Sequence, residues 1–175
     1  MKLIREFRPS DLLEFNIVNL DKYTETYSAA FYLSYSCSFP EYFLVCEHSS
    51  GAIMGYIMGK AEGRGVNWHG HVTAISIAPE YRRMGLAREL MNKLEEISEE
   101  KGCYYVDLFV RVSNKVAVKM YETLGYVIYR RIIDYYSGEN GEDAYDMRKA
   151  LSHDYERKSI IPLKHPVHSS ELEDD

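Results

Sequence analysis

The stretch PEYRRMGLA, at residues 79–87, combines two arginines with small residues where a helix is expected to begin. Arg82 and Arg83 stand just before the spacing Gly85-x-Ala87. A helix N-terminus already carries about half a positive charge, so cations are normally unfavourable there and anions are favoured. The predicted helix instead places acidic residues in its last turns: Glu95, Glu96, Glu99 and Glu100. This reversed pattern predicts an anion site built from backbone N–H groups and guanidinium groups.

The motif differs from the common nucleotide-binding loops. No Gly-Lys-Ser/Thr follows, as a P-loop would require, and the GxGxxG spacing of a dinucleotide fold is absent. The strand expected before it ends in Ile77-Ala78-Pro79, and Gly85 and Ala87 would let phosphate oxygens approach the backbone. A solvated surface helix with a chance basic turn is the alternative interpretation.

The elements that must hold this motif alternate between strands and helices. Strands are predicted at 3–7, 42–47, 52–63, 69–79, 103–110, 126–136 and 144–151. Helices are predicted at 12–20, 27–35, 85–102 and 114–124. Apolar residues recur at helical spacing in the third helix and predict its core face: Leu86, Leu90, Met91, Leu94 and Ile97.

Length and composition exclude several classes of protein. With 175 residues, 46% of them hydrophobic, the chain is expected to form one domain, and a net charge of −6 argues against a nucleic-acid-binding surface. Cys37, Cys46 and Cys103 show no CxxC spacing, so neither a disulfide framework nor a zinc site is indicated. No run of 18 apolar residues and no apolar N-terminal segment is found, so we expect a cytoplasmic protein without direct membrane contact.

The composition changes from Ser152 onward. Acidic residues outnumber basic ones, Pro162 and Pro166 interrupt the segment, and apolar residues are sparse. We expect a folded domain over residues 1–151 and an extended or disordered tail over 152–175, with the SIIPL patch able to dock on the domain or on a partner.

Two motifs in chain order resemble the GNAT acetyltransferases. IAPEYRRMGLA resembles the family's acetyl-CoA pyrophosphate motif, Arg-x-x-Gly-x-Ala after a strand end. SNKVAVKMYETLGY resembles its second signature, through Asn114, Ala117 and Tyr121. The resemblance covers residues 1–150. It implies the α/β GNAT fold, a single mixed central sheet of about seven strands flanked by about four helices, with the fourth and fifth strands splayed.

Further stretches resemble the GNAT enzymes that acetylate protein N-termini in which Met precedes Asp, Glu, Asn or Gln. These are LDKYTETY, FYLSYSCSFPEYF, MGYIMGKAEG, WHGHVTAISIAP, VDLFVRVSN, AYDMRKAL and KSIIPLKHPV. The loop before Trp68 is short for this group, and the last acidic residues differ. The resemblance implies a large helical-repeat auxiliary subunit, the ribosome and nascent N-termini as partners.

Acetyl-CoA is the acetyl donor that this resemblance implies. A backbone N–H near Ile77 would meet the thioester carbonyl, and Tyr121 matches the general acid for the coenzyme A sulfur; a core aromatic is its alternative interpretation. An α-amino group has a pKa of about 7.7 to 8.0, against about 10.4 for lysine, so only modest base assistance is needed. The implied cofactor contacts are Ile75, Ser76, Ile77, Arg82, Arg83, Met84, Gly85, Leu86, Ala87, Asn114 and Tyr121. Asn114 is also a good helix N-cap.

The peptide site implied by the resemblance uses residues from three segments. His71 and Thr73, two apart on a strand, can share a face and donate hydrogen bonds to the second peptide residue. Glu25 matches a peptide-contacting or water-activating acid, and completes the catalytic set with Tyr121 and His71. The implied peptide contacts are Glu25, Tyr27, His71, Thr73, Ala74, Tyr135, Tyr136 and Gly138. Of the two adjacent tyrosines, we expect one to bind the peptide and the other to pack.

No metal is expected, although His69 and His71 have the spacing of a ligand pair, because the sequence offers no third ligand at a fitting distance. Two other functions stay open at this point. One is a related transferase that acts on other N-termini or on lysine, and the other is a GNAT-shaped module that binds coenzyme A without turnover.

Overall fold

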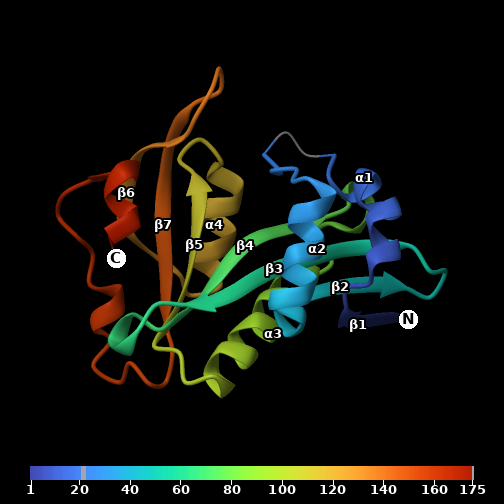
Figure 1. Ribbon diagram of the computed structural model, residues 1–175, viewed down its shortest axis with the longest axis horizontal. Helices are drawn as coiled ribbons and strands as arrows, with labels where there is room; N and C mark the ends of the chain where they lie inside the picture. The colour runs from blue at the N-terminus through green and yellow to red at the C-terminus, as the bar shows by residue number, and fades with distance from the viewer. Residues whose placement is uncertain (21–22, 175) are drawn as a thin grey trace. The chain divides into compact units, whose positions relative to one another are not determined.

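The computed structural model describes residues 1–20 and 23–174 (Figure 1). One sheet has the strand order β1-β2-β3-β4-β5-β7-β6-β8. Its strands are β1 (Lys2–Glu6), β2 (Phe43–His48), β3 (Ile53–Glu62), β4 (His69–Ile77), β5 (Tyr105–Arg111), β6 (Val127–Tyr136), β7 (Glu142–Ala150) and β8 (Val167–His168). The α-helices are α1 (Phe15–Val18), α2 (Ala29–Ser38), α3 (Leu86–Glu100) and α4 (Lys115–Thr123).

The chain divides into two compact units. The first contains residues 1–60 and 72–97, and the second contains residues 61–71 and 98–175. Strands β3 and β4 contribute residues to both units. Of the helices described, none has the length and apolar character needed to span a membrane.

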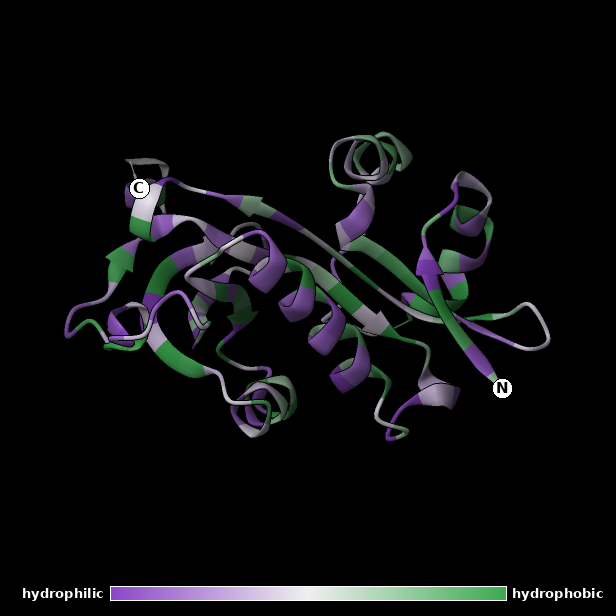
Figure 2. Ribbon diagram, turned by 90° about the horizontal axis from the view of Figure 1, so that it is seen from below, coloured by the Kyte–Doolittle hydropathy of each residue, from purple (hydrophilic) through white to green (hydrophobic). Residues whose placement is uncertain are grey.

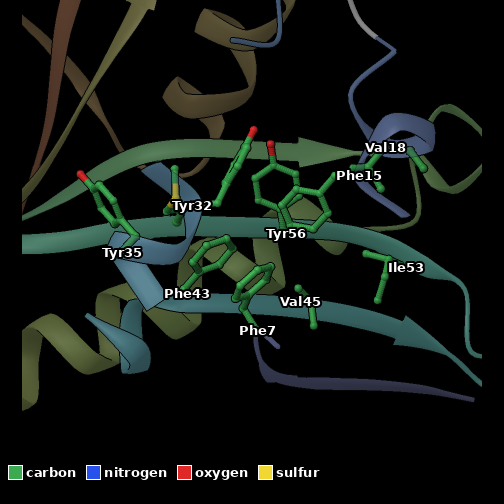
Figure 3. Close-up of a cluster of buried hydrophobic side chains, with 11 residues drawn as sticks. Phe7, Phe15, Val18, Tyr32, Tyr35, Phe43, Val45, Ile53 and Tyr56 are labelled. Carbon is green, nitrogen blue, oxygen red and sulfur yellow. The ribbon is translucent and has the colours of Figure 1, made fainter. Parts of the chain in front are cut away.

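The first unit has an aromatic core on one face of its strands (Figure 3). Phe15 of α1 stacks on Tyr56 of β3 with ring centroids 4.3 Å apart, and Phe7 stacks on Phe43 of β2 at 4.0 Å. Tyr32 of α2 meets Phe15 edge to face at 5.3 Å. These contacts hold α1 and α2 against β2 and β3.

Helix α3 packs on the other face of the same strands. Leu86 lies in a cluster with Cys46 of β2 and Met54 of β3. The predicted core face of the helix is confirmed at four buried positions, while Ile97 is half-buried. Figure 2 shows hydrophilic residues along the side of α3 turned toward the viewer. The helix is therefore amphipathic, and its buried side fixes the loop that precedes it.

The helix predicted at 12–20 is replaced by a 3-10 turn, η1 (Pro9–Glu14), followed by the single α-turn of α1. The buried carboxylate of Asp11 accepts the backbone N–H of Arg8 at 2.7 Å and two guanidinium hydrogen bonds from Arg5 at 2.9 Å. These bonds anchor the turn to β1. The other three predicted helices are present, with shifted ends.

The second unit ends in a segment that differs from the extended or disordered tail expected after residue 151. Strand β7 is antiparallel to both β5 and β6, and β8 pairs in parallel with β6, where Ile132 faces Val167. This segment therefore supplies the eighth strand beyond the seven expected. The Asp154 carboxylate accepts the backbone N–H groups of Lys158 and Ser159 at 3.0 Å, which orders the turn before η5 (Lys158–Ile160).

Candidate active site

The loop between β4 and α3 contains two residues with left-handed backbone conformation. Its φ angles enter the left-handed region at Arg83, with 61°, and at Gly85, with 80°. Arg82 donates from Nε to the Ile77 carbonyl at 3.0 Å, which ties the loop to the end of β4. A Cβ built on Gly85 would meet nothing within 4 Å, so the space in front of this backbone is open.

Helix α3 begins at Leu86, directly after this loop. The first N–H groups of a helix have no intrahelical acceptors, and its dipole adds positive potential. Arg82, Arg83 and Met84 are exposed, whereas Leu86 is buried and Ala87 is half-buried. The loop thus offers N–H groups, guanidinium groups and free approach, which fits the phosphates of a coenzyme A.

Strand β4 enters this loop with Ile75, Ser76 and Ile77. Ser76 is buried and donates to the carbonyl of Val18 at 3.2 Å, and its hydroxyl lies 3.5 Å from that of Thr24. A Cβ on Gly55 of β3 would lie 2.7 Å from the Ser76 carbonyl oxygen, so only glycine allows this close strand packing. The last residues of β4 are therefore held firmly on both sides.

Helix α4 carries the second motif. Asn114 caps the helix, because its Oδ1 accepts the N–H of Ala117 at 3.2 Å. Tyr121 is 7% exposed, and its ring lies 6.1 Å from that of Tyr126. Burial raises the pKa of the Tyr121 hydroxyl above its ordinary value. The hydroxyl is therefore protonated at neutral pH.

His71 of β4 contacts two residues that the sequence analysis missed. Its Nδ1 lies 2.7 Å from Oδ1 of Asp107, and its ring meets Phe109 at 5.2 Å; both partners are on β5. Asp107 is 4% exposed. The sequence did hint at Asp107, because a charged residue stands within the apolar strand VDLFV. Its partner could not be predicted, because it depends on which strands pair.

A third potential metal ligand, Glu62, lies near His69, although its spacing in the sequence did not indicate this. Its Nε2 lies 3.6 Å from Oε1 of Glu62 on β3 and 3.5 Å from Oδ2 of Asp107. Ligand atoms of Glu62, His69 and His71 lie within 4.8 Å of one another, a spacing that a metal ion could also use. The expectation that no third ligand is near is therefore wrong. The short hydrogen bond between His71 and Asp107 nevertheless indicates a proton on Nδ1 of His71.

The first unit holds Thr73, Ala74 and the loop before α2. The Thr73 hydroxyl is 2.7 Å from that of Tyr35, and Ala74 packs against the aromatic core. Tyr27 stacks on Phe31 at 4.5 Å, and its N–H donates to the Tyr32 hydroxyl at 3.3 Å. Glu25 is exposed in the same loop.

The second unit gathers the remaining peptide candidates. The rings of Tyr135 and Phe109 lie 4.9 Å apart, and Phe109 also contacts His71. The guanidinium of Arg111 lies 3.9 Å from the centre of the Tyr136 ring. The two tyrosine rings also touch each other at 5.0 Å. A regular strand would point them to opposite faces, but the register shifts between Ile132 and Tyr136, where Asp134 has a φ of 54°.

Gly138 lies in the turn after β6 with a φ of 91° and open space at its Cβ position. The N–H of Gly141 donates to its carbonyl at 3.1 Å. The turn therefore needs glycine for its backbone conformation.

The loop before α3 and the capped helix α4 carry the two motifs that the sequence analysis singled out. The chain belongs to the GNAT acetyltransferase family: the family model described as "Acetyltransferase (GNAT) family" matches residues 10–126. The predicted GNAT fold, α/β with a mixed sheet, is confirmed.

Relatives within the family are N-terminal acetyltransferases. The Arabidopsis thaliana protein "N-terminal acetyltransferase B complex catalytic subunit NAA20" is 58% identical over 176 residues, which cover 100% of both chains. A crystal structure of Chaetomium thermophilum Naa20 with a bisubstrate analogue has a TM-score of 0.90 and 42% identity, covering 96% of this chain and 97% of that one. The NatB acetyltransferase complex bound to CoA and MES has a TM-score of 0.78 and 40% identity, covering 85% and 99%.

Proposed function

We propose that this protein is the catalytic subunit of a NatB-type enzyme, which transfers acetyl from acetyl-CoA to the α-amino group of proteins that begin with Met-Asp, Met-Glu, Met-Asn or Met-Gln. The observation that carries the proposal is the full-length match at 58% identity to a NatB catalytic subunit. The intact Arg82-x-x-Gly85-x-Ala87 loop and the protonated Tyr121 argue for turnover rather than for a coenzyme-binding module.

The residues of the β4–α3 loop are proposed to hold the acetyl donor, which supplies an activated acetyl thioester. The N–H groups at Gly85, Leu86 and Ala87 and the guanidinium groups of Arg82 and Arg83 fit its phosphates. Backbone groups of residues 75–77 would hydrogen-bond the donor arm, and the N–H near Ile77 would stabilise the oxyanion that forms during attack. Met84 and Asn114 are proposed as flanking contacts.

Proton transfer is assigned to residues outside this loop. Tyr121 is proposed to donate the proton that the leaving sulfur needs, because burial keeps its hydroxyl protonated. Glu25, exposed in the loop before α2, is proposed to order a water that accepts the proton of the α-ammonium. Only modest base assistance is needed for this step, because an α-amino group has a pKa of about 7.7 to 8.0.

His71 and Thr73 are proposed to recognise the second residue of the peptide. Both lie on β4 with one residue between them, so their side chains leave the same face of the strand. Glu25, Tyr27, Ala74 and Tyr121 are proposed to line the site of the initiating Met. Tyr135, Tyr136 and the Gly138 turn are proposed to cover the peptide backbone.

The auxiliary subunit is proposed to dock on exposed apolar residues at the start of the chain. Tyr32 and Tyr35 of α2 are buried in the core and cannot contribute to such a surface. Exposed apolar side chains instead stand on η1, α1, α2 and the segment after α1, namely Leu13, Ile17, Leu20 and Leu33. A helical-repeat partner that covers them would bring the enzyme to nascent chains on cytoplasmic ribosomes, with no direct contact to nucleic acid or membrane. We propose residues 1–151 as the acetyltransferase domain.

A peptide panel tests the function on both the isolated chain and its complex with the auxiliary subunit. A buried donor left unpaired costs about 1 to 3 kcal/mol, so Met-Ala and Met-Leu peptides should fall about 10- to 100-fold below Met-Asp in kcat/KM. Ser-initiated peptides and lysine side chains should be nearly inert, and the isolated chain should be the weaker catalyst. His71→Ala should erase much of the Met-Asp preference, while the exposed His165→Ala should keep it. A preference for Met-Leu, Ser-Glu or lysine would refute the assignment.

Arg82→Ala tests the phosphate loop. A charge-assisted hydrogen bond is worth about 1.5 to 3 kcal/mol, so the KM for acetyl-CoA should rise about tenfold or more, with the peptide KM nearly unchanged. The exposed Arg64→Ala is the matched control and should bind the donor as wild type does. Calorimetry with desulfo-coenzyme A, which carries no acetyl group to transfer, measures binding alone. Equal affinity in Arg82→Ala and wild type would show that the loop does not bind the phosphates.

A further inference from the structure

Four ionisable side chains on three strands of the second unit form a continuous line, of which the proposed function uses only the last. Glu62 of β3 faces His69 of β4 at 3.6 Å, and His69 faces Asp107 of β5 at 3.5 Å. Asp107 then bonds His71 of β4 at 2.7 Å. The line joins a half-exposed carboxylate to the histidine proposed to read the peptide.

The backbone of β4 places both histidines on one face. Between them, Gly70 points to the other face, where an added Cβ would lie 2.2 Å from Oγ of Ser98 and 3.3 Å from Val106. A larger residue there would require Ser98 and its surroundings to move. On the opposite face, both histidines approach Asp107.

Asp107 is an ionised acceptor. Burial alone would raise the pKa of its carboxyl, but the charge and hydrogen bond of His71, with the charges of His69 and Arg148, hold that pKa below its ordinary value. An ionised carboxylate accepts hydrogen bonds and donates none. At 2.7 Å, the proton of the His71–Asp107 bond must therefore belong to Nδ1 of His71.

This bond determines what the other ring nitrogen can do. A neutral imidazole carries one N–H, so with Nδ1 protonated the Nε2 of His71 holds a lone pair, and a second proton makes the ring a cation. Asp107 is the hydrogen-bond partner of the ring among the described residues, and Phe109 packs beside it at 5.2 Å. Nε2 is thus the nitrogen left for a ligand.

His69 holds the second oxygen of Asp107. Its Nδ1 lies 2.6 Å from the Asn67 carbonyl, which can only accept, so this nitrogen carries a proton. Its Nε2 faces the carboxylates of Glu62 and Asp107. Burial alone would lower the pKa of His69, but the two carboxylates and the carbonyl raise it overall. His69, stacked on Tyr105 at 4.7 Å, lies 3.5 Å from the second carboxylate oxygen of Asp107 and helps to orient it.

We propose that Asp107 is the positioning residue that fixes the proton arrangement of His71 and thereby favours an acidic second residue in the peptide over an amide one. This inference rests on the proposed function. With Asp107 as counter-ion, His71 can carry protons on both nitrogens and donate Nε2–H to the carboxylate of Met-Asp or Met-Glu. A neutral ring with a bare Nε2 would repel that carboxylate, yet it could still accept from the NH2 of an amide.

Asp107→Asn separates charge from shape. The Asn amide can donate to Nδ1 of His71, which moves the proton of the neutral ring to Nε2. That ring still donates to a peptide oxygen, but without charge. Because the neutral ring keeps a hydrogen bond to the peptide carboxylate but loses the Coulombic attraction to it, the ratio of kcat/KM for Met-Asp over Met-Asn should fall about tenfold. The kcat for Met-Asn should stay within about threefold of wild type.

The tautomer can be measured without catalysis. In the full chain labelled with 15N at histidine, long-range 1H–15N spectra distinguish protonated from bare ring nitrogens, and His71→Ala identifies the signals. Wild type should show a protonated Nδ1 at His71, and Asp107→Asn should show the neutral ring with its proton on Nε2. Asp134→Asn, whose side chain is 74% exposed, is the matched control and should change neither the spectrum of His71 nor the peptide ratio.

Three results would overturn the proposal. The first is a wild-type His71 with its proton on Nε2 alone, and the second is an equal loss for Met-Asp and Met-Asn in a folded Asp107→Asn. The third is tight binding of Zn²⁺ alone in calorimetry with loss of the Nδ1 proton, which would make the cluster a metal centre. If wild type acetylates neither peptide, the proposed function fails, while the spectra still decide the role of Asp107.

Discussion

Replacing Tyr121 with phenylalanine is expected to lower kcat about 100-fold, with the KM values for peptide and acetyl-CoA changed little. General acid catalysis contributes about 10²- to 10⁴-fold, and Tyr121→Phe removes only the hydroxyl that would supply the proton. The ring and its contact with Tyr126 at 6.1 Å remain. The loss should therefore fall on the chemical step rather than on binding or folding.

The controls for this substitution come from the same chain. Tyr155 is 86% exposed, and Tyr155→Phe should leave kcat unchanged. Burial raises the pKa of Tyr121, so its hydroxyl should stay protonated beyond about pH 10, the ordinary value for tyrosine, and wild-type kcat should show no loss from this group below it. A Tyr121→Phe enzyme with normal kcat would mean that the tyrosine only packs, as its burial would also allow.

Features encoded by neighbouring residues could be predicted from the sequence. The phosphate loop needs a glycine turn, arginines and a helix start, all within residues 79–87, and the structure has left-handed φ angles at Arg83 and Gly85. The N-cap at Asn114 and the core face of α3 are equally local. Such features follow from backbone conformation and helical period, which a short stretch of sequence determines.

Features that depend on strand pairing could not be predicted. Asp107 and Phe109 reach His71 only because β4 and β5 are neighbours, and Glu62 reaches His69 from a third strand. The contact between Tyr135 and Tyr136 depends on a register shift near Asp134. The ordered tail depends on the pairing of β8 with β6, which its polar composition did not indicate.

A second buried acid, Asp146 of β7, makes the fold depend on its arginine partners. Its side chain is fully buried and accepts from Nε of Arg130 at 2.9 Å and from Arg148 at 3.2 and 3.3 Å. The Arg148 guanidinium also lies over the rings of Tyr129 at 3.5 Å and Tyr105 at 4.5 Å. The Asp146 carboxylate therefore balances the positive charges of Arg130 and Arg148. Because the site is buried, water cannot take the place of the carboxylate.

Asp146→Ala is expected to destabilise the protein by about 3 to 5 kcal/mol, because breaking a buried ion pair leaves an uncompensated charge inside. For a chain of this size each kcal/mol shifts Tm by about 2 to 4 °C, so Tm should fall by about 10 °C. Asp146→Asn keeps an acceptor and should lose less. Glu96→Ala, which breaks an exposed pair with Lys93, should shift Tm by at most about 2 °C. If calorimetry gives Asp146→Ala the Tm of wild type, the buried carboxylate does not stabilise the arginines, and aromatic stacking on Tyr129 and Tyr105 must be enough to hold Arg148.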